Sequence, residues 1–121
     1  MYNLKALFKE NDKGKAVPEL EHVFYPVEED KDIKVVCTYL TSGEMTKYMD
    51  RKGNQNMEAI VIDHVKKIEG INITDEKTGK EVEVTPQLLL ALPGTFVSSL
   101  MASIYAHIVA GADLTGEEVK N

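Results

Sequence analysis

The stretch TPQLLLALPGTFVSSLMASIYAHIVAGAD, residues 85–113, decides the fold of this chain. No Lys, Arg, Asp or Glu lies between Glu83 and Asp113, although 28% of all residues are charged. Pro93-Gly94 interrupts the run, because neither residue continues a helix easily. We therefore predict two helices separated by a Pro-Gly corner, with the second as the central helix of the core.

The second of these helices is predicted over residues 95–110, ended by Gly111. Its bulky apolar residues recur at helical spacing and form one stripe: Phe96, Val97, Leu100, Met101, Ile104, Tyr105, Ile108 and Val109. A second stripe contains small residues, which let another helix approach closely, so we expect cover on two sides of this helix. The residues that we predict to form an interface with a partner are Ser98, Ala102, Ala106, Ala110, Phe96 and Tyr105.

The shorter helix of the stretch begins after Thr85, a residue type that caps helices by accepting a backbone N–H. Pro86 follows at the first helical position, where proline is favoured. Upstream, the N-terminal third predicts extended structure: a strand over residues 2–8, a turn over 11–15, extended chain over 16–27 and the clearest strand over 33–40.

Two further helices and a hairpin are predicted between residues 41 and 84. Thr41 and Glu44 form a capping-box pattern that starts a short helix over residues 42–50. Apolar residues at helical spacing predict a second helix over residues 56–69, with Gly70 just after its end. Two alternating runs, 71–74 and 81–84, flank a turn that contains Gly79 and predict a β-hairpin.

The sequence thus predicts one α+β domain over residues 1–121. Its C-terminal two-thirds are mainly helical, with about four helices and a β-hairpin, and antiparallel strands form the N-terminal part. Residues 114–121 are expected to be an exposed tail.

Composition excludes several classes of function. The net charge of −6 argues against nucleic acid as a main partner, because phosphate binding requires a basic surface. Cys37 is the single cysteine, so an internal disulfide is excluded and a reduced, cytoplasmic setting is expected. The uncharged stretch is long enough to cross a membrane, but Pro93-Gly94 interrupts it and its flanks are acidic, so we predict no span.

No motif for catalysis, metal binding or a cofactor stands out. His22, His64 and His107 lie far apart along the chain, each without a neighbouring Cys or His, so we predict no metal site. His64 is expected to border the core, and His107 to bond to a backbone carbonyl or to a neighbouring chain. Cys37 is interpreted as a small buried hydrophobe, because nothing basic shares its predicted strand face.

Catalytic serine chemistry is not indicated either. Ser98, Ser99 and Ser103 lie in a predicted helix, without the Gly-x-Ser-x-Gly elbow that exposes a nucleophile. No carboxylate lies within an apolar run, where burial would raise its pKa for acid–base work. We therefore predict a non-enzymatic protein with no cofactor.

The order of short motifs over residues 33–121 resembles small tail proteins of tailed phages and prophages, especially tail assembly chaperones. The motifs are Tyr39-Leu40-Thr41-Ser42-Gly43-Glu44 after a strand, Val61 and Val65 at helical spacing, Ile71-Asn72-Ile73, Thr85-Pro86 before Leu88-Leu89, Leu92-Pro93-Gly94, and the ending Leu114-Thr115-Gly116-Glu117-Glu118-Val119-Lys120-Asn121.

The resemblance implies a non-enzymatic role in the cytoplasm of a bacterial host. Such chaperones are encoded beside the tape-measure gene and are thought to coat the apolar tape-measure helix until the tail tube polymerises around it. The expected partner is therefore the tape-measure protein or another tail protein, and the apolar last helix also predicts self-association. Two alternatives remain: a structural virion component, for tail completion or head–tail joining, and a small-ligand-binding domain with a pocket between the hairpin and the last helix.

Overall fold

The computed structural model describes residues 1 and 3–112, and these form an α+β fold, as predicted. The strands are β1 (Phe8–Glu10), β2 (Ala16–Pro18), β3 (Glu21–Phe24), β4 (Lys34–Thr38), β5 (Val65–Glu69), β6 (Ile73–Thr74) and β7 (Glu81–Val82). The helices are the 3₁₀ helix η1 (Ser42–Tyr48), α1 (Met57–His64), α2 (Pro86–Ala91) and α3 (Thr95–Ala110). The predicted exposed tail, 114–121, lies outside the described residues.

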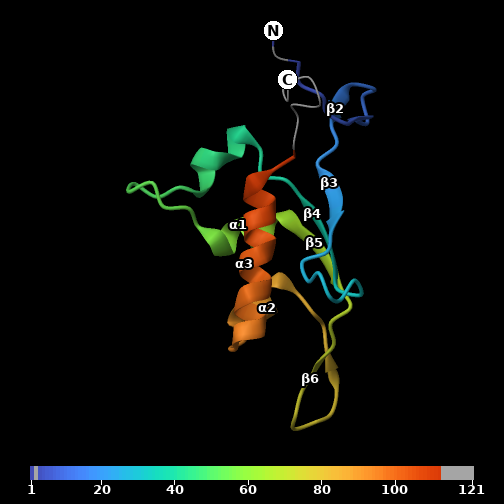
Figure 1. Ribbon diagram of the computed structural model, residues 1–121, viewed down its shortest axis with the longest axis vertical. Helices are drawn as coiled ribbons and strands as arrows, with labels where there is room; N and C mark the ends of the chain where they lie inside the picture. The colour runs from blue at the N-terminus through green and yellow to red at the C-terminus, as the bar shows by residue number, and fades with distance from the viewer. Residues whose placement is uncertain (2, 113–121) are drawn as a thin grey trace.

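The strands form one central sheet and two separate hairpins. The sheet is antiparallel with the order β3-β4-β5, while β1 pairs only with β2, and β6 only with β7. Figure 1 shows the β6–β7 hairpin extending away from the helices at one end of the molecule and the β1–β2 hairpin at the other. The body between them therefore consists of a small sheet and the helices.

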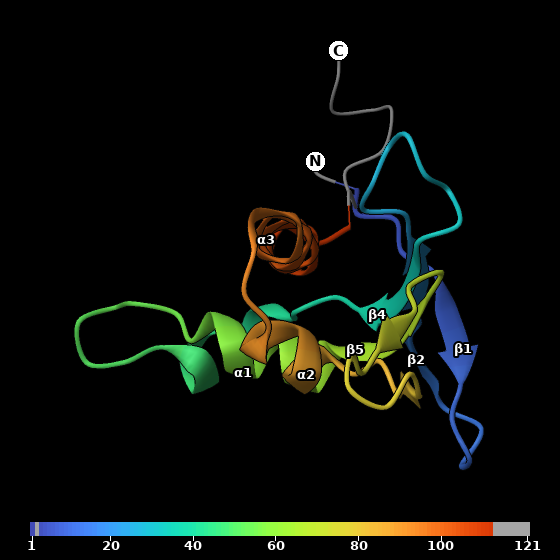
Figure 2. The same ribbon diagram turned by 90° about the horizontal axis from the view of Figure 1, so that it is seen from below.

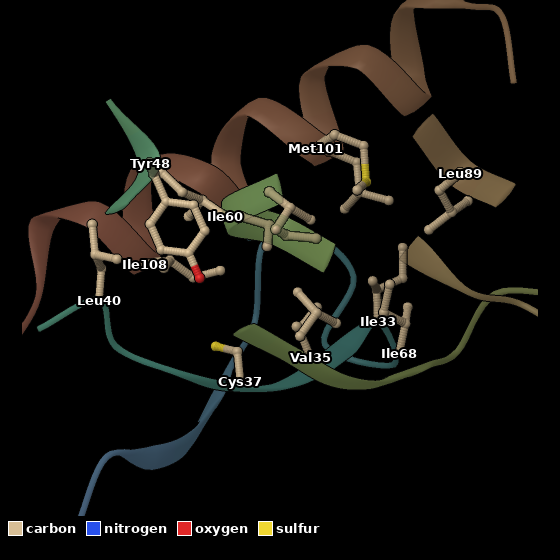
Figure 3. Packing of buried hydrophobic residues seen from close by; sticks show 14 residues of the cluster. Ile33, Val35, Cys37, Leu40, Tyr48, Ile60, Ile68, Leu89, Met101 and Ile108 are labelled. Atoms are coloured by element: carbon tan, nitrogen blue, oxygen red, sulfur yellow. The ribbon is translucent and has the colours of Figure 1, made fainter. Parts of the chain in front are cut away.

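The helices pack on one face of this sheet and form the core with it. Val35 and Cys37 of β4 are fully buried, as are Ile60 of α1 and Ile104 of α3. Figure 3 shows side chains from β4, β5 and all the helices converging between the two layers. The backbone N–H of Leu40, just after β4, donates to the carbonyl of Ile108 in α3 at 3.1 Å, which ties the two layers together.

The charge-free stretch folds as predicted. The hydroxyl of Thr85 accepts the N–H of Leu88 at 3.1 Å, and Pro86 opens α2. Gly94, with a φ of 118°, makes the corner before α3, and Gly111, with a φ of 73°, ends that helix. No helix among residues 1 and 3–112 has the length and apolar character needed to cross a bilayer.

The predicted helix over residues 56–69 is wrong in its second half. Asn56 caps α1 by accepting the N–H of Ala59, but the helix ends at His64 and the chain continues directly as β5. The apolar residues Val65 and Ile68 fit helical spacing, yet they also fill the inner face of the sheet once β5 pairs with β4. Pairing with a strand that lies far away in sequence therefore overrides the local pattern.

The predicted strand over residues 2–8 is also misplaced. Residues 3–7 have no regular structure, and the strand is β1, which begins at Phe8. The turn over residues 11–15 determines this register, because the side-chain oxygen of Asn11 accepts the N–H groups of Lys13 and Lys15, each at 2.9 Å. The predicted capping box is confirmed, since the carboxylate of Glu44 accepts the N–H of Thr41 at 3.0 Å in front of η1.

Candidate functional site

One long side of α3 is exposed and carries no charge. Its exposed residues are Thr95, Phe96, Ser98, Ser99, Ala102, Ala106 and Ala110. In Figure 2, which views α3 end-on, α1 and α2 lie on one side of the helix and the sheet on another, and no described element covers the remaining side. Within this chain the helix is therefore covered on its bulky side only.

Five of the six predicted interface residues lie on this exposed side: Phe96, Ser98, Ala102, Ala106 and Ala110. The side chain of Phe96 is 55% exposed at the start of α3. Tyr105 is placed differently, because it is half-buried against the core and its hydroxyl donates to the side-chain oxygen of Gln55 at 2.6 Å. It therefore borders the uncharged α3 side without belonging to it.

A shallow polar depression lies between η1 and the start of α1. Its volume is about 530 Å³, and its lining residues include Lys47, Tyr48, Asp50, Gln55 and Asp63. The hydroxyl of Tyr48 donates to the carboxylate of Asp63 at 2.7 Å. Burial first, and this hydrogen bond second, raise the pKa of Tyr48 to about 12. None of His64, His107 and Cys37 contributes to this depression.

Three chemically reactive side chains meet instead between the sheet and α3. His22 of β3 lies directly opposite Cys37 of β4, and His107 approaches from α3. The Nε2 atoms of the two histidines are 2.7 Å apart, and the Sγ atom of Cys37 is 3.5 Å from Nε2 of His22. Each residue offers one ligand atom, and these atoms all lie within 4.8 Å of one another. We call these residues the His-Cys-His cluster.

Aromatic contacts hold both imidazole rings of the cluster in place. The ring of His22 stacks on Tyr39 with centroids 3.7 Å apart, and the ring of His107 stacks on Phe24 at 3.8 Å. The Nδ1 atom of His22 is 3.0 Å from the carbonyl oxygen of Leu20. Because a carbonyl only accepts hydrogen bonds, Nδ1 of His22 carries the proton and its Nε2 presents a lone pair to the cluster.

Burial favours the uncharged forms of Cys37 and His107 in this cluster. It raises the pKa of the fully buried Cys37 thiol to about 11. The pKa of His107 is lowered by burial first and by the neighbouring His22 second. Both shifts favour the neutral forms, as expected for ionisable groups between a sheet and a helix. The cluster therefore contains a thiol and two imidazoles that share a hydrogen bond.

This arrangement refines one prediction and corrects another. No basic residue of β4 shares the strand face of Cys37, as predicted, but His22 of the neighbouring strand brings an imidazole next to the thiol. His107 bonds to His22, and not to a backbone carbonyl as one prediction had it. Cys37 and His107 follow His22 by 15 and 85 positions along the chain, so no sequence spacing could have indicated the cluster. The only available signal was the period-two pattern of β4, which places Cys37 on the inner face.

His64 lies apart from this cluster and borders the core, as predicted. It is buried, and its Nδ1 atom is 2.7 Å from the carbonyl oxygen of Ile60. Its Nε2 atom is 3.3 Å from the carboxylate of Glu44, so the imidazole links α1 to the cap of η1. These contacts satisfy both ring nitrogens and give His64 a structural role.

The described part of the chain therefore offers two candidate sites of different kinds. The exposed α3 side suits another protein, because it is long, uncharged and built largely of small residues. The His-Cys-His cluster offers nitrogen and sulfur donors in a largely enclosed setting. No protein-family model, curated protein or solved structure matches this chain.

Proposed function

We propose that this chain is a non-enzymatic accessory protein of a phage or prophage tail. In this proposal it acts in the bacterial host cytoplasm as an assembly chaperone that binds the tape-measure protein through apolar surface. The observation that carries the proposal is the exposed α3 side, which has no charged residue although the chain has a net charge of −6. Exposed uncharged surface of this extent is typical of a binding site for another protein.

The chemistry of this side fits a helical partner. Ser98, Ala102 and Ala106 are small, so a second helix can approach the backbone of α3 closely. Sixteen helical residues extend over about 24 Å, enough to contact several turns of a long apolar helix. At one end, the exposed ring of Phe96 adds a bulky apolar contact.

The remaining surface fits the same role. The acidic balance of the chain produces repulsion between copies, which opposes aggregation while an apolar surface is exposed. Several other large apolar side chains are also exposed, including Leu4, Leu7 and Phe8 near the β1–β2 hairpin. A chaperone that coats an extended apolar helix needs this combination of apolar contact area and a charged body.

The test is co-expression of the chain with the tape-measure protein encoded at the same locus. We expect the two proteins to co-purify, and we expect Ala102→Glu and Ala106→Glu to abolish the complex by placing a charge on the exposed α3 side. Thr78→Glu, which adds the same charge at the exposed tip of the β6–β7 hairpin, should leave binding unchanged. Equal binding by all variants would contradict the assignment of this surface.

The composition of mature particles separates a chaperone from a virion component. A chaperone is absent from purified phage, whereas a tail-completion or head–tail joining protein is present in fixed stoichiometry. Mass spectrometry of particles from the same locus distinguishes the two. If the genes beside the one that encodes this chain included no phage structural genes, the proposal would be contradicted.

A further inference from the structure

We propose that His22, Cys37 and His107 bind one transition-metal ion of the borderline-soft class, with Zn²⁺ as the chemical representative. The three donors come from β3, β4 and α3, so a bound ion would join two neighbouring strands of the sheet to the last helix. This inference does not depend on the proposed function, because it uses no residue of the exposed α3 side.

The donor atoms select the class of metal. A thiolate and two imidazoles are preferred by Zn²⁺, Co²⁺ and copper, whereas Mg²⁺ and Ca²⁺ require oxygen ligands. No carboxylate belongs to the His-Cys-His cluster, so hard cations find no suitable ligand there. Three protein ligands leave one position of a tetrahedral ion open for water or an external ligand.

Two of the three donor–donor distances are close to those that a tetrahedral ion requires. The third, between Cys37 and His107, is within 4.8 Å. Zn–S bonds of about 2.3 Å and Zn–N bonds of about 2.0–2.1 Å place sulfur and nitrogen about 3.6 Å apart, and two nitrogens about 3.3 Å apart. Sγ of Cys37 and Nε2 of His22 are 3.5 Å apart, which already fits. The two Nε2 atoms are 2.7 Å apart and must separate by about 0.6 Å, a shift that small rotations of the side chains supply.

The contacts behind the donors match those of metal-bound histidines. A ligating histidine usually donates its second ring N–H to a carbonyl or carboxylate, which fixes the tautomer and the ring orientation. His22 does this through Nδ1 and the carbonyl of Leu20. Stacking on Tyr39 and on Phe24 holds the two imidazole planes, so little side-chain freedom would be lost on binding.

The proton balance of binding is simple. The S–H bond of Cys37 breaks as sulfur bonds the ion, and this proton passes to solvent. Because Nε2 of His22 is an acceptor, Nε2 of His107 donates the hydrogen bond that joins the two rings. On binding, that proton moves to Nδ1 of His107 through solvent exchange, and the freed Nε2 lone pair bonds the ion. The charge of the ion offsets the cost of a buried thiolate.

The test uses the full-length chain without a histidine tag, after treatment with a chelator and dialysis. Titration with Co²⁺ alone should give intense visible bands of tetrahedral cobalt and a near-ultraviolet band from thiolate-to-cobalt charge transfer. Both should saturate at one ion per chain and disappear when Zn²⁺ is added. Absence of the charge-transfer band in the wild-type protein would overturn the proposal without any variant.

Matched variants locate the ion. Cys37→Ser should abolish the charge-transfer band, and His22→Gln and His107→Gln should each weaken binding at least about tenfold. His64→Gln removes the remaining histidine of the chain and should leave the spectrum unchanged. Circular dichroism verifies the fold of each variant. A spectrum that depends on His64, or that survives in Cys37→Ser, would place the ion elsewhere and contradict the proposal.

Discussion

At the scale of single residues, Gly70 is constrained by two features at once. It follows β5 with a φ of +84°, in the left-handed region that L-residues avoid. A Cβ atom at this position would lie only 2.0 Å from the backbone carbonyl oxygen of Asp32. Only glycine therefore permits the close approach of the segment before β4 to the end of β5.

We expect Gly70→Ala to destabilise the protein by about 3 kcal/mol or more, because backbone strain and steric overlap both contribute. Gly79→Ala is the matched control, since its φ is +70° but nothing lies within 4 Å of the added Cβ. That change should cost only about 1–2 kcal/mol. Urea denaturation of the two variants measures the difference, and equal losses would show that the contact with Asp32 has no effect.

The ionisation of the Glu44 carboxyl makes the free energy of unfolding depend on pH. Its pKa is lowered from 4.5, first by the hydrogen bond from the backbone N–H of Thr41 and also by the hydroxyl of Thr41 and by His64. A carboxyl whose pKa is lower in the folded state stabilises the fold above its unfolded pKa, and this contribution is lost as pH falls through the folded pKa. The contribution of Glu44 should therefore be lost on acidification below about pH 4.5.

Glu44→Gln tests this expectation, because glutamine still offers an oxygen to Thr41 but does not ionise. The free energy of unfolding of the wild type should exceed that of the variant near neutral pH, and the two should converge below pH 4.5. The lowered pKa values of Asp50 and Glu69 affect both proteins equally. Parallel curves for the two proteins down to low pH would contradict the role of the Glu44 charge.

At the scale of elements, a helix could be predicted with its ends only where capping, proline or glycine residues mark those ends in the sequence. Thr85-Pro86, Gly94 and Gly111 act within one or two turns, so α2 and α3 were predicted with their ends. The end of α1 has no such cue, and Val65 and Ile68 fit both a helix and a strand. The choice depends on hydrogen bonds to β4, about thirty residues upstream, which a local pattern does not contain.

The two sides of α3 give a direct test of its orientation. Ile104 is fully buried, so Ile104→Asp places an unpaired charge in the core and should unfold the domain, whose total stability is about 5–15 kcal/mol. Ala102→Asp changes an exposed residue two positions away and should leave the protein folded. Circular dichroism distinguishes these outcomes, and a folded Ile104→Asp variant would show that the bulky stripe is not the core.

At the scale of the whole molecule, the sequence predicted the fold class but not the His-Cys-His cluster. The α+β class follows from composition and from the order of patterns along the chain. The cluster depends on which strand lies beside β4 and on which turn of α3 crosses it. On the exposed α3 side, in contrast, Ser98, Ala102, Ala106 and Ala110 could be predicted, because helical periodicity separates these small residues from the bulky ones. Phe96 belongs to the bulky stripe by its spacing and is exposed nevertheless.

We also expect the isolated protein to self-associate through the exposed α3 side when no partner is present. Light scattering should show a mass above that of the 13.5 kDa chain at high concentration. Ala106→Glu should restore the monomer, whereas Thr78→Glu should not. A strict monomer at all concentrations would contradict this expectation. The binding of a tape-measure helix is tested separately by co-expression.

The position of α3 in the order of elements has a consequence for synthesis on the ribosome. Every strand of the central sheet is translated before α3, yet Ile104 and Ile108 of this helix belong to the same buried cluster as Val35 and Cys37 of β4. The core of the nascent chain therefore remains incomplete until at least residue 108 has left the exit tunnel, because Leu40 bonds to Ile108. Folding is thus completed only after α3 has been translated, and a chain released before α3 would expose the apolar residues that this helix covers, the kind of species that aggregates.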